Sequence, residues 1–86
     1  MNWEQIREEH PNQWVVFEAL AAHDEDKKRI IDKLSLVNAF GEDSISAWKH
    51  YAQLHRENPH SEYYVYHTTH EKLDIGIIDG LGRILS

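Results

Sequence analysis

The segment Asp43–Glu57, DSISAWKHYAQLHRE, is the clearest amphipathic helix in the sequence. At about 100° per residue, one broad side of this helix is apolar or aromatic; its members are Ile45, Ala47, Trp48, Tyr51, Ala52, Leu54 and His55. The opposite sector is polar and contains Lys49, His50, Gln53, Arg56 and Glu57. Asp43 or Ser44 can cap the first turn, and Asn58-Pro59 ends the helix. The apolar side needs a partner, and the neighbouring segments are strand-like.

Two strand-like segments precede this helix. Gln13–Ala22 is apolar on both alternating sides, which is typical of a strand with neighbours or cover on both faces. Helix is the rival interpretation for Phe17–Arg29, because Ala, Leu and Glu favour it. We expect Asp24–Lys27 to form a polar turn and Arg29–Phe40 to return as the antiparallel partner strand.

Two further strands are predicted after the helix. Glu62–Thr68, EYYVYHT, is rich in aromatic and β-branched residues, and Leu73–Ile78 alternates more weakly. Asp79-Gly80 and Gly82 break the pattern, so we expect residues 79–86 to form a loosely ordered tail or a last edge pairing.

A short helix over Asn2–Glu9 is predicted to open the chain. Asn2 and Gln5 have capping-box spacing, and Trp3 and Ile6, three residues apart, would form a buried edge. The element order is therefore α-β-β-α-β-β in a single α+β domain spanning residues 1–86. If the helical crossover is right-handed, the third strand pairs beside the first, and we expect an antiparallel sheet of order 2-1-3-4 with the main helix across one face.

Composition narrows the classes of function. The 86 residues carry a net charge of −6, which opposes binding to nucleic acid, where affinity comes mainly from lysine and arginine. There is no cysteine, and no apolar run is long enough to cross a bilayer. The N-terminal residues have no signal-peptide pattern. We therefore expect a cytoplasmic protein without a membrane or nucleic-acid partner.

Seven histidines raise the question of a metal site. His67 and His70 form an H-x-x-H pair, and His60 lies seven residues upstream of His67. Residues three apart on a strand point to opposite faces, so this pair converges only if a turn intervenes. We expect no metal and no cofactor, with these three histidines as the candidates if one binds.

No catalytic residue can be assigned from the sequence. The hydroxyls of Ser44, Thr68 and Thr69 lack a recognisable base and are better explained as caps. Glu18, flanked by apolar residues, is the acid most open to a raised pKa, unless it is solvated or pairs with a residue such as Lys33. Gly76, Gly80 and Gly82 are read as turn glycines, because no helix follows them as a phosphate loop requires.

Aromatic residues supply the candidates for an interface: Tyr64, Tyr66, Trp48 and Trp3. Tyr64 and Tyr66 lie on one face of the predicted strand, and tyrosine and tryptophan are enriched where proteins meet. The alternative is a sheet covered on one face by the main helix and on the other by Trp3 and the short first helix.

The pattern of Trp3, Ile6 and the stretch 11–15, PNQWV, resembles a set of small uncharacterised bacterial proteins of Firmicute type. The stretches 54–59, LHRENP, and 64–68, YVYHT, extend the resemblance to about Ile75. The set has no assigned activity, so the resemblance implies no functional residue.

Three hypotheses of function follow. The first is a non-catalytic domain that associates with itself, as a homodimer, or with another protein. The second is a metal- or histidine-dependent hydrolase. The third is an acidic regulator, similar to an antitoxin, that binds a basic partner, and it requires the acids to cluster on one face.

Overall fold

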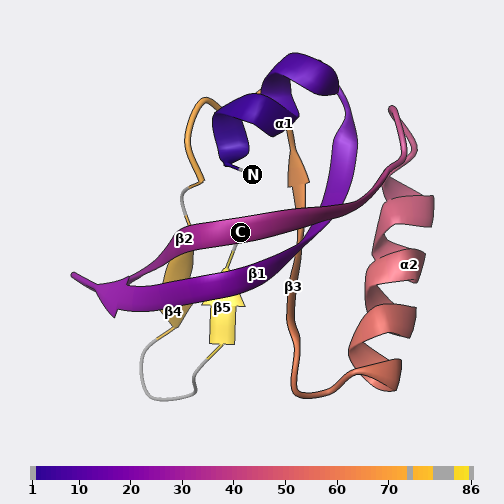
Figure 1. Ribbon diagram of the computed structural model, residues 1–86. Coiled ribbons are helices and arrows are strands. Elements are labelled where there is room, and N and C mark those ends of the chain that lie inside the picture. The colour runs from indigo at the N-terminus through magenta and orange to yellow at the C-terminus, as the bar shows by residue number, and fades with distance from the viewer. Residues whose placement is uncertain (1, 74, 79–82, 86) are drawn as a thin grey trace.

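The computed structural model describes residues 2–73, 75–78 and 83–85, which form two helices and an antiparallel sheet (Figure 1). In chain order the elements are α1 (Trp3–Glu9), β1 (Trp14–Glu25), β2 (Lys28–Ala39), α2 (Ser44–Glu57), β3 (Glu62–His67), β4 (Gly76–Ile78) and β5 (Arg83–Leu85). The strand order across the sheet is β3-β1-β2-β4-β5.

The long hairpin of β1 and β2 is the centre of the sheet. Asp26 and Lys27 both have positive φ, 49° and 62°, as a two-residue hairpin turn requires. The turn is thus shorter than expected, and the strands extend to Glu25 and from Lys28. The rival helical interpretation of Phe17–Arg29 is wrong, because β1 pairs with β2 along its length and with β3 up to Ala19.

The predicted order is confirmed for three strands and wrong for the fourth. β1 lies between β2 and β3, but β4 pairs with β2, at Lys28↔Gly76, and not with β3. The chain leaves β3 and packs Leu73 and Ile75 into the core before it reaches the hairpin, so β4 is shorter than expected. β5 pairs with β4, which is the edge pairing left open for the tail, whereas residues 79–82 and 86 lie outside the described part of the chain.

The larger core lies on the face of the sheet that α1 covers. Trp3 and Ile6 dock there as expected, 8% and 0% exposed. Trp3 packs against the rings of Phe17 and Tyr66, with centroids 5.9 and 5.5 Å away. The remaining buried members are Val15, Leu34, Tyr64 and Ile75. A two-turn helix is unstable alone, so this docking is what holds α1 in place.

A smaller core lies between α2 and the opposite face of the sheet. Ala47 packs with Val16 and Val65, and Trp14, Phe40, Tyr51 and Leu54 surround them. The side of α2 that packs on the sheet is narrower than predicted. It also extends toward His50, which was expected on the polar side and whose ring lies 5.5 Å from that of Phe40. The other members of the predicted apolar side, Ile45, Trp48, Ala52 and His55, are exposed.

Thr68, 2% exposed, joins distant parts of the chain. Its hydroxyl donates to the carbonyl oxygen of His10 at 2.7 Å and accepts from the backbone N–H of Gln13 at 2.9 Å. Arg7 Nε donates to the Thr68 carbonyl oxygen at 2.9 Å. Thr68 therefore fixes the turn between α1 and β1 against the end of β3. The sequence suggested that its hydroxyl caps a local turn, but its hydrogen bonds join residues far apart in the chain.

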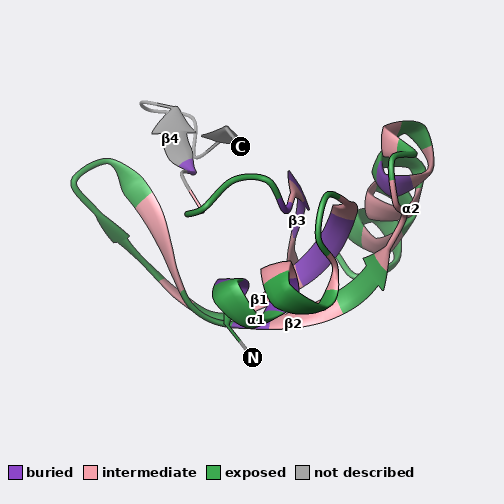
Figure 2. Cartoon of the chain, turned by 90° about the horizontal axis from the view of Figure 1, so that it is seen from above, coloured by how far each residue is buried: buried purple, intermediate pink, exposed green. Residues whose placement is uncertain are grey.

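The far half of the hairpin projects beyond both cores (Figures 1 and 2). None of residues 20–33 is buried, and Leu20 is 53% exposed. The β1–β2 register is irregular between Ala19 and Ala22, where the projecting half begins. Bulges of this kind bend and twist a strand.

Candidate functional site

An exposed apolar strip follows the outer side of α2. Ile45 and Trp48 are 68% and 47% exposed, and Ala52 and His55 continue the strip. The spacing of the four residues is 3-4-3, which is the a/d spacing of a coiled-coil seam. The Trp48 ring meets Tyr51 edge-on at 5.5 Å, and Tyr51 stacks on His55 at 6.0 Å. Tyr51 is part of the smaller core, so the sheet supports the aromatic side of the strip.

The two ends of α2 carry opposite charges. Asp43 caps the helix by accepting from the Ser46 N–H at 3.0 Å and the Ser46 hydroxyl at 2.6 Å, and these bonds lower its carboxyl pKa. The sequence pointed to Asp43 as a cap but missed Ser46 as its partner. Glu42 precedes the cap, and Arg56 lies in the last turn. Within the described residues, neither Glu42 nor Arg56 has a side-chain partner.

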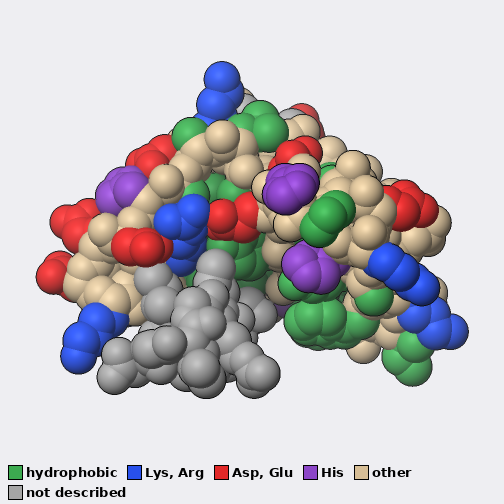
Figure 3. Space-filling model, turned by 90° about the horizontal axis from the view of Figure 1, so that it is seen from below, with side chains coloured by type: hydrophobic (Ala, Val, Ile, Leu, Met, Phe, Trp, Pro, Cys, Tyr) green, Lys and Arg blue, Asp and Glu red, His purple; other side chains and the backbone are tan. Residues whose placement is uncertain are grey.

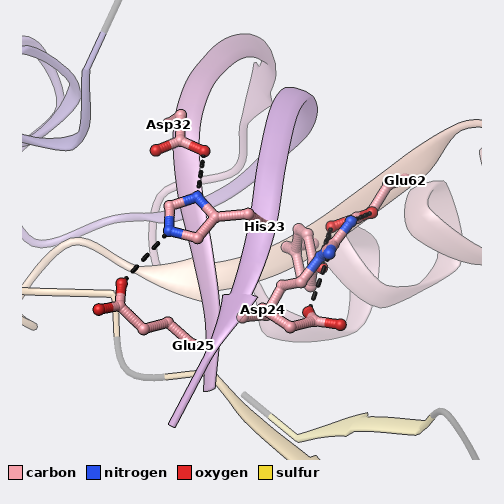
Figure 4. Close-up of polar contacts among 7 residues, drawn as sticks. His23, Asp24, Glu25, Asp32 and Glu62 are labelled. Carbon is pink, nitrogen blue, oxygen red and sulfur yellow. Dashed lines mark hydrogen bonds and ion pairs between the residues drawn. The ribbon is translucent and has the colours of Figure 1, made fainter. Parts of the chain in front are cut away.

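A second polar group joins the hairpin to β3 (Figure 4). Arg29 on β2 donates from Nε and Nη2 to the two carboxylate oxygens of Glu62, at 3.1 and 2.8 Å, and from Nη1 to Asp24 at 2.9 Å. The paired guanidinium lowers the Glu62 pKa, and burial together with the Glu62 carboxylate raises the Tyr64 pKa. The Tyr64 hydroxyl also donates to Glu62. The group is electrostatically satisfied, so its role is to hold the hairpin against β3.

Beside this group lies an open hollow of about 430 Å³. Residues 18–22 of β1 line it together with Arg29, His60, Ser61 and Glu62. Glu18 is the one lining acid without a side-chain partner among the described residues, and it does not pair with Lys33. Its environment differs from the apolar one suggested by the neighbouring residues, because β1 is leaving the core at this point.

His23, on the projecting half of the hairpin, lies between two carboxylates (Figure 4). Its Nδ1 is 2.6 Å from Asp32 and its Nε2 is 3.3 Å from Glu25, and the hydrogen bond to Asp32 is the main reason its pKa is raised. The imidazole is about half exposed and is not among the residues that line the hollow described above. Among the described residues, its ring nitrogens bond only to these two carboxylates and to no serine or threonine hydroxyl, so no activated side-chain nucleophile is formed here.

The three candidate metal ligands do not converge. His67 packs against Trp14, at 5.0 Å, whereas His70 packs against Tyr66 at 4.8 Å in the larger core. A turn does intervene between them, with the His70 N–H bonded to the His67 carbonyl oxygen at 3.2 Å, but it directs the two rings to different faces of the sheet. His60 lines the hollow instead. No three His, Asp or Glu side chains gather as a metal would require within the described residues.

Three of the four interface candidates are core residues. Tyr64 and Tyr66 are 6% and 5% exposed and, like Trp3, pack beneath α1. The prediction that the two tyrosines form a surface pair is wrong, because the face they share is the one that α1 and the segment after β3 cover. Trp48 alone remains accessible.

The acidic side chains are distributed over several elements. They occur on α1, on the hairpin and before α2, and in the view of Figure 3 acidic, basic and histidine side chains are interspersed. Two of the hairpin acids, Asp24 and Asp32, are bonded to Arg29 and His23. This mixing weakens the case for an acidic regulator, which relies on one acidic face.

The fold and these surfaces define a small α+β domain with two helices on opposite faces of an antiparallel sheet. No protein-family model, curated protein or solved structure matches the chain. The resemblance to Firmicute-type proteins stays a prediction. In the part of the chain that the structure describes, no helix has the length and apolar character to cross a membrane.

Proposed function

We propose that the protein is a self-associating, non-catalytic domain whose α2 helices pair in a two-fold dimer. The observation that carries this proposal is the exposed strip of Ile45, Trp48, Ala52 and His55, with its seam-like spacing. Tryptophan in the centre of such a strip is the side chain most often decisive in protein contacts. We place the domain in the cytoplasm, since a chain without cysteine suits a reducing compartment.

An antiparallel arrangement makes this strip complementary to itself. When the helices pair about a two-fold axis between residues 48 and 52, Trp48 faces the small Ala52 of the second copy, and Ile45 faces His55. The large Trp48 side chain thus packs against a small alanine, and the branched Ile45 side chain packs against the flat imidazole of His55. Because the dimer is symmetric, each of these two contacts occurs twice, so the seam consists of four layers of paired side chains.

The charges at the ends of α2 support the same arrangement. In the antiparallel pair, Arg56 of one copy lies beside the N-terminal end of the other helix, where Glu42 and Asp43 are found. Opposite charges at the rim of an interface favour one orientation over the other. A parallel pair would place like charges together, so the antiparallel orientation is the one we propose.

The expected affinity is modest. One face of a 14-residue helix buries less than the roughly 1,200 Å² of total surface that a standard stable interface buries. We therefore expect a dimer that dissociates on dilution in the micromolar range or above, in which association could be regulated by protein concentration.

Light scattering and sedimentation across a dilution series from micromolar to millimolar protein test this proposal. Trp48→Ala is expected to leave a monomer, whereas Lys33→Glu, an exposed charge change on β2, is the matched control and leaves the equilibrium close to wild type. A wild-type chain that stays monomeric at millimolar concentration contradicts the proposal.

A charge exchange tests the antiparallel orientation. Arg56→Glu and Glu42→Arg should each weaken the dimer, because each places like charges together across the two-fold axis. The double variant restores an opposite-charge pair and should recover the affinity. A double variant as weak as the sum of the single changes would refute this geometry.

A further inference from the structure

Among the residues that the structure describes, no strand pairs with the β3-facing edge of β1 beyond Ala19, and this stretch is called the open edge. Pairing with β3 ends at Ala19↔Glu62, but β1 continues to Glu25. On the opposite side of the hairpin, Arg29 directs its backbone N–H outward to the Ile75 carbonyl oxygen at 2.9 Å. Its register partner Asp24 must therefore also direct its backbone groups away from β2, and Ala22, two residues earlier, does the same.

The hollow lies along this open edge. It is bounded by residues 18–22 of β1 and by His60, Ser61 and Glu62, which lead into β3. An added strand in this space would lie on β1 as a continuation of β3. The residues at the edge, Leu20, Ala21 and Ala22, include neither lysine nor proline, which proteins commonly use to block such pairing.

The ion group of Arg29, Glu62 and Asp24 borders the hollow, since Arg29 and Glu62 are among its lining residues. Arg29 bonds to Asp24 on β1 and through both oxygens to Glu62, so the hairpin and the start of β3 are fixed relative to each other. A site that is already formed loses less conformational freedom when a ligand binds.

The charge of the lining selects the kind of ligand. Arg29 is neutralised by Glu62 and Asp24, and Glu18 adds a carboxylate with no partner among the described residues. The chain as a whole carries a net charge of −6. Both local and overall charge therefore favour a cationic segment over an anionic one.

We infer that this edge binds an extended, lysine- or arginine-bearing segment of a partner protein by strand addition. The backbone of the segment pairs with Ala22 and Asp24, and one cationic side chain reaches Glu18. Leu20, 53% exposed, offers an apolar contact for a neighbouring side chain. This site is separate from the strip on α2, and neither proposal depends on the other.

Titration of the 86-residue chain with two synthetic peptides tests the inference. The probe is acetyl-Val-Lys-Val-Lys-Val-amide, and the control replaces both lysines with glutamate. Backbone amide resonances are followed by NMR. Saturable shifts confined to residues 18–25 and 60–62 with the lysine peptide alone are the expected result. Equal shifts with both peptides, or none at millimolar peptide, would overturn it.

Two variations separate strand addition from simple charge attraction. A lysine peptide N-methylated at every residue keeps its charge but cannot donate backbone hydrogen bonds, and it should not bind. Glu18→Gln should weaken the lysine peptide by about two- to fivefold, as expected of an exposed ion pair. Glu8→Gln on α1 is the matched control and should leave affinity unchanged. An N-methylated peptide that binds equally well refutes strand addition.

The same titration with the Trp48→Ala variant distinguishes this site from the proposed dimer. Peptide shifts should be the same in a chain whose α2 strip is disabled. If the unliganded protein shows intermolecular contacts along residues 20–25, a second copy occupies the edge and the assignment to a basic segment is wrong.

Discussion

Trp3 and Trp48 are the same residue type in opposite environments, and truncating each to alanine should have very different effects on the free energy of unfolding. Trp3 is 8% exposed, contacts two aromatic rings and donates from its indole N–H to the His70 carbonyl oxygen at 2.8 Å. Removing a buried tryptophan costs about 3–5 kcal/mol. Trp48 is 47% exposed and its ring meets that of its helix neighbour Tyr51, so its loss should cost within about 0.5 kcal/mol.

The loss of stability predicted for Trp3→Ala is a large fraction of the total free energy of unfolding. A domain of 86 residues is expected to have about 4–13 kcal/mol of stability in total. Trp3→Ala should therefore lower the melting temperature by more than about 12 °C, at about 4–8 °C per kcal/mol. Urea unfolding monitored by circular dichroism, at a concentration where the chain is monomeric, gives both free energies. Equal losses for the two variants would refute the assignment of Trp3 to the core.

Three further predictions concern a cap, a turn and a carboxylate. Asp43→Ala removes the cap of α2 and should cost about 1 kcal/mol by urea unfolding. Asp26→Asn with Lys27→Gly suits the positive φ of both turn residues and should add about 1 kcal/mol by the same assay. The Glu62 pKa lies below its ordinary value of 4.5, chiefly because of Arg29, so the unfolded chain takes up the proton first. The stability that this carboxylate contributes is therefore fully present above pH 4.5 and is lost as the pH falls through its pKa in the folded protein. In Glu62→Gln, the free energy of unfolding should depend less steeply on pH in that range.

Each of these predictions has a contradicting outcome. An unchanged midpoint for Asp43→Ala would mean that the cap is not formed in solution, and Ser46→Ala is the comparison that isolates the second of its bonds. A destabilised Asn-Gly hairpin would argue against the turn conformation. If Glu62→Gln keeps the full acid dependence, another carboxylate is responsible.

Local chemistry explains which parts of the fold could be predicted. The caps at Asn2 and Asp43 and the strand at β1, apolar on both faces near its start, depend on a few neighbouring residues, and all are observed. The position of β4 depends on where Leu73 and Ile75 pack, and these residues contact elements distant in the chain. Such long-range choices leave no local pattern, so the fourth strand was placed on the wrong side of the sheet.

The candidate sites were harder to predict for a related reason. Helical periodicity places Ile45 and Trp48 on the same broad side as Ala47, but it does not tell how wide a stripe the sheet will cover. The open edge of β1 results from the difference in length between β1 and β3, which only the pairing register reveals. For Glu18, flanking apolar residues suggested burial, although the strand leaves the core at that position.

The bonding pattern around Thr68 has a consequence for the order of folding. The hydrogen bonds Trp3→His70, Arg7→Thr68 and Thr68→His10 span 67, 61 and 58 positions of the chain. During synthesis, α1 leaves the ribosome before β3, so it must wait until β3 and the residues after it have been made before these bonds can form. Contacts between such distant residues slow folding, so α1 should be among the last elements to become fixed.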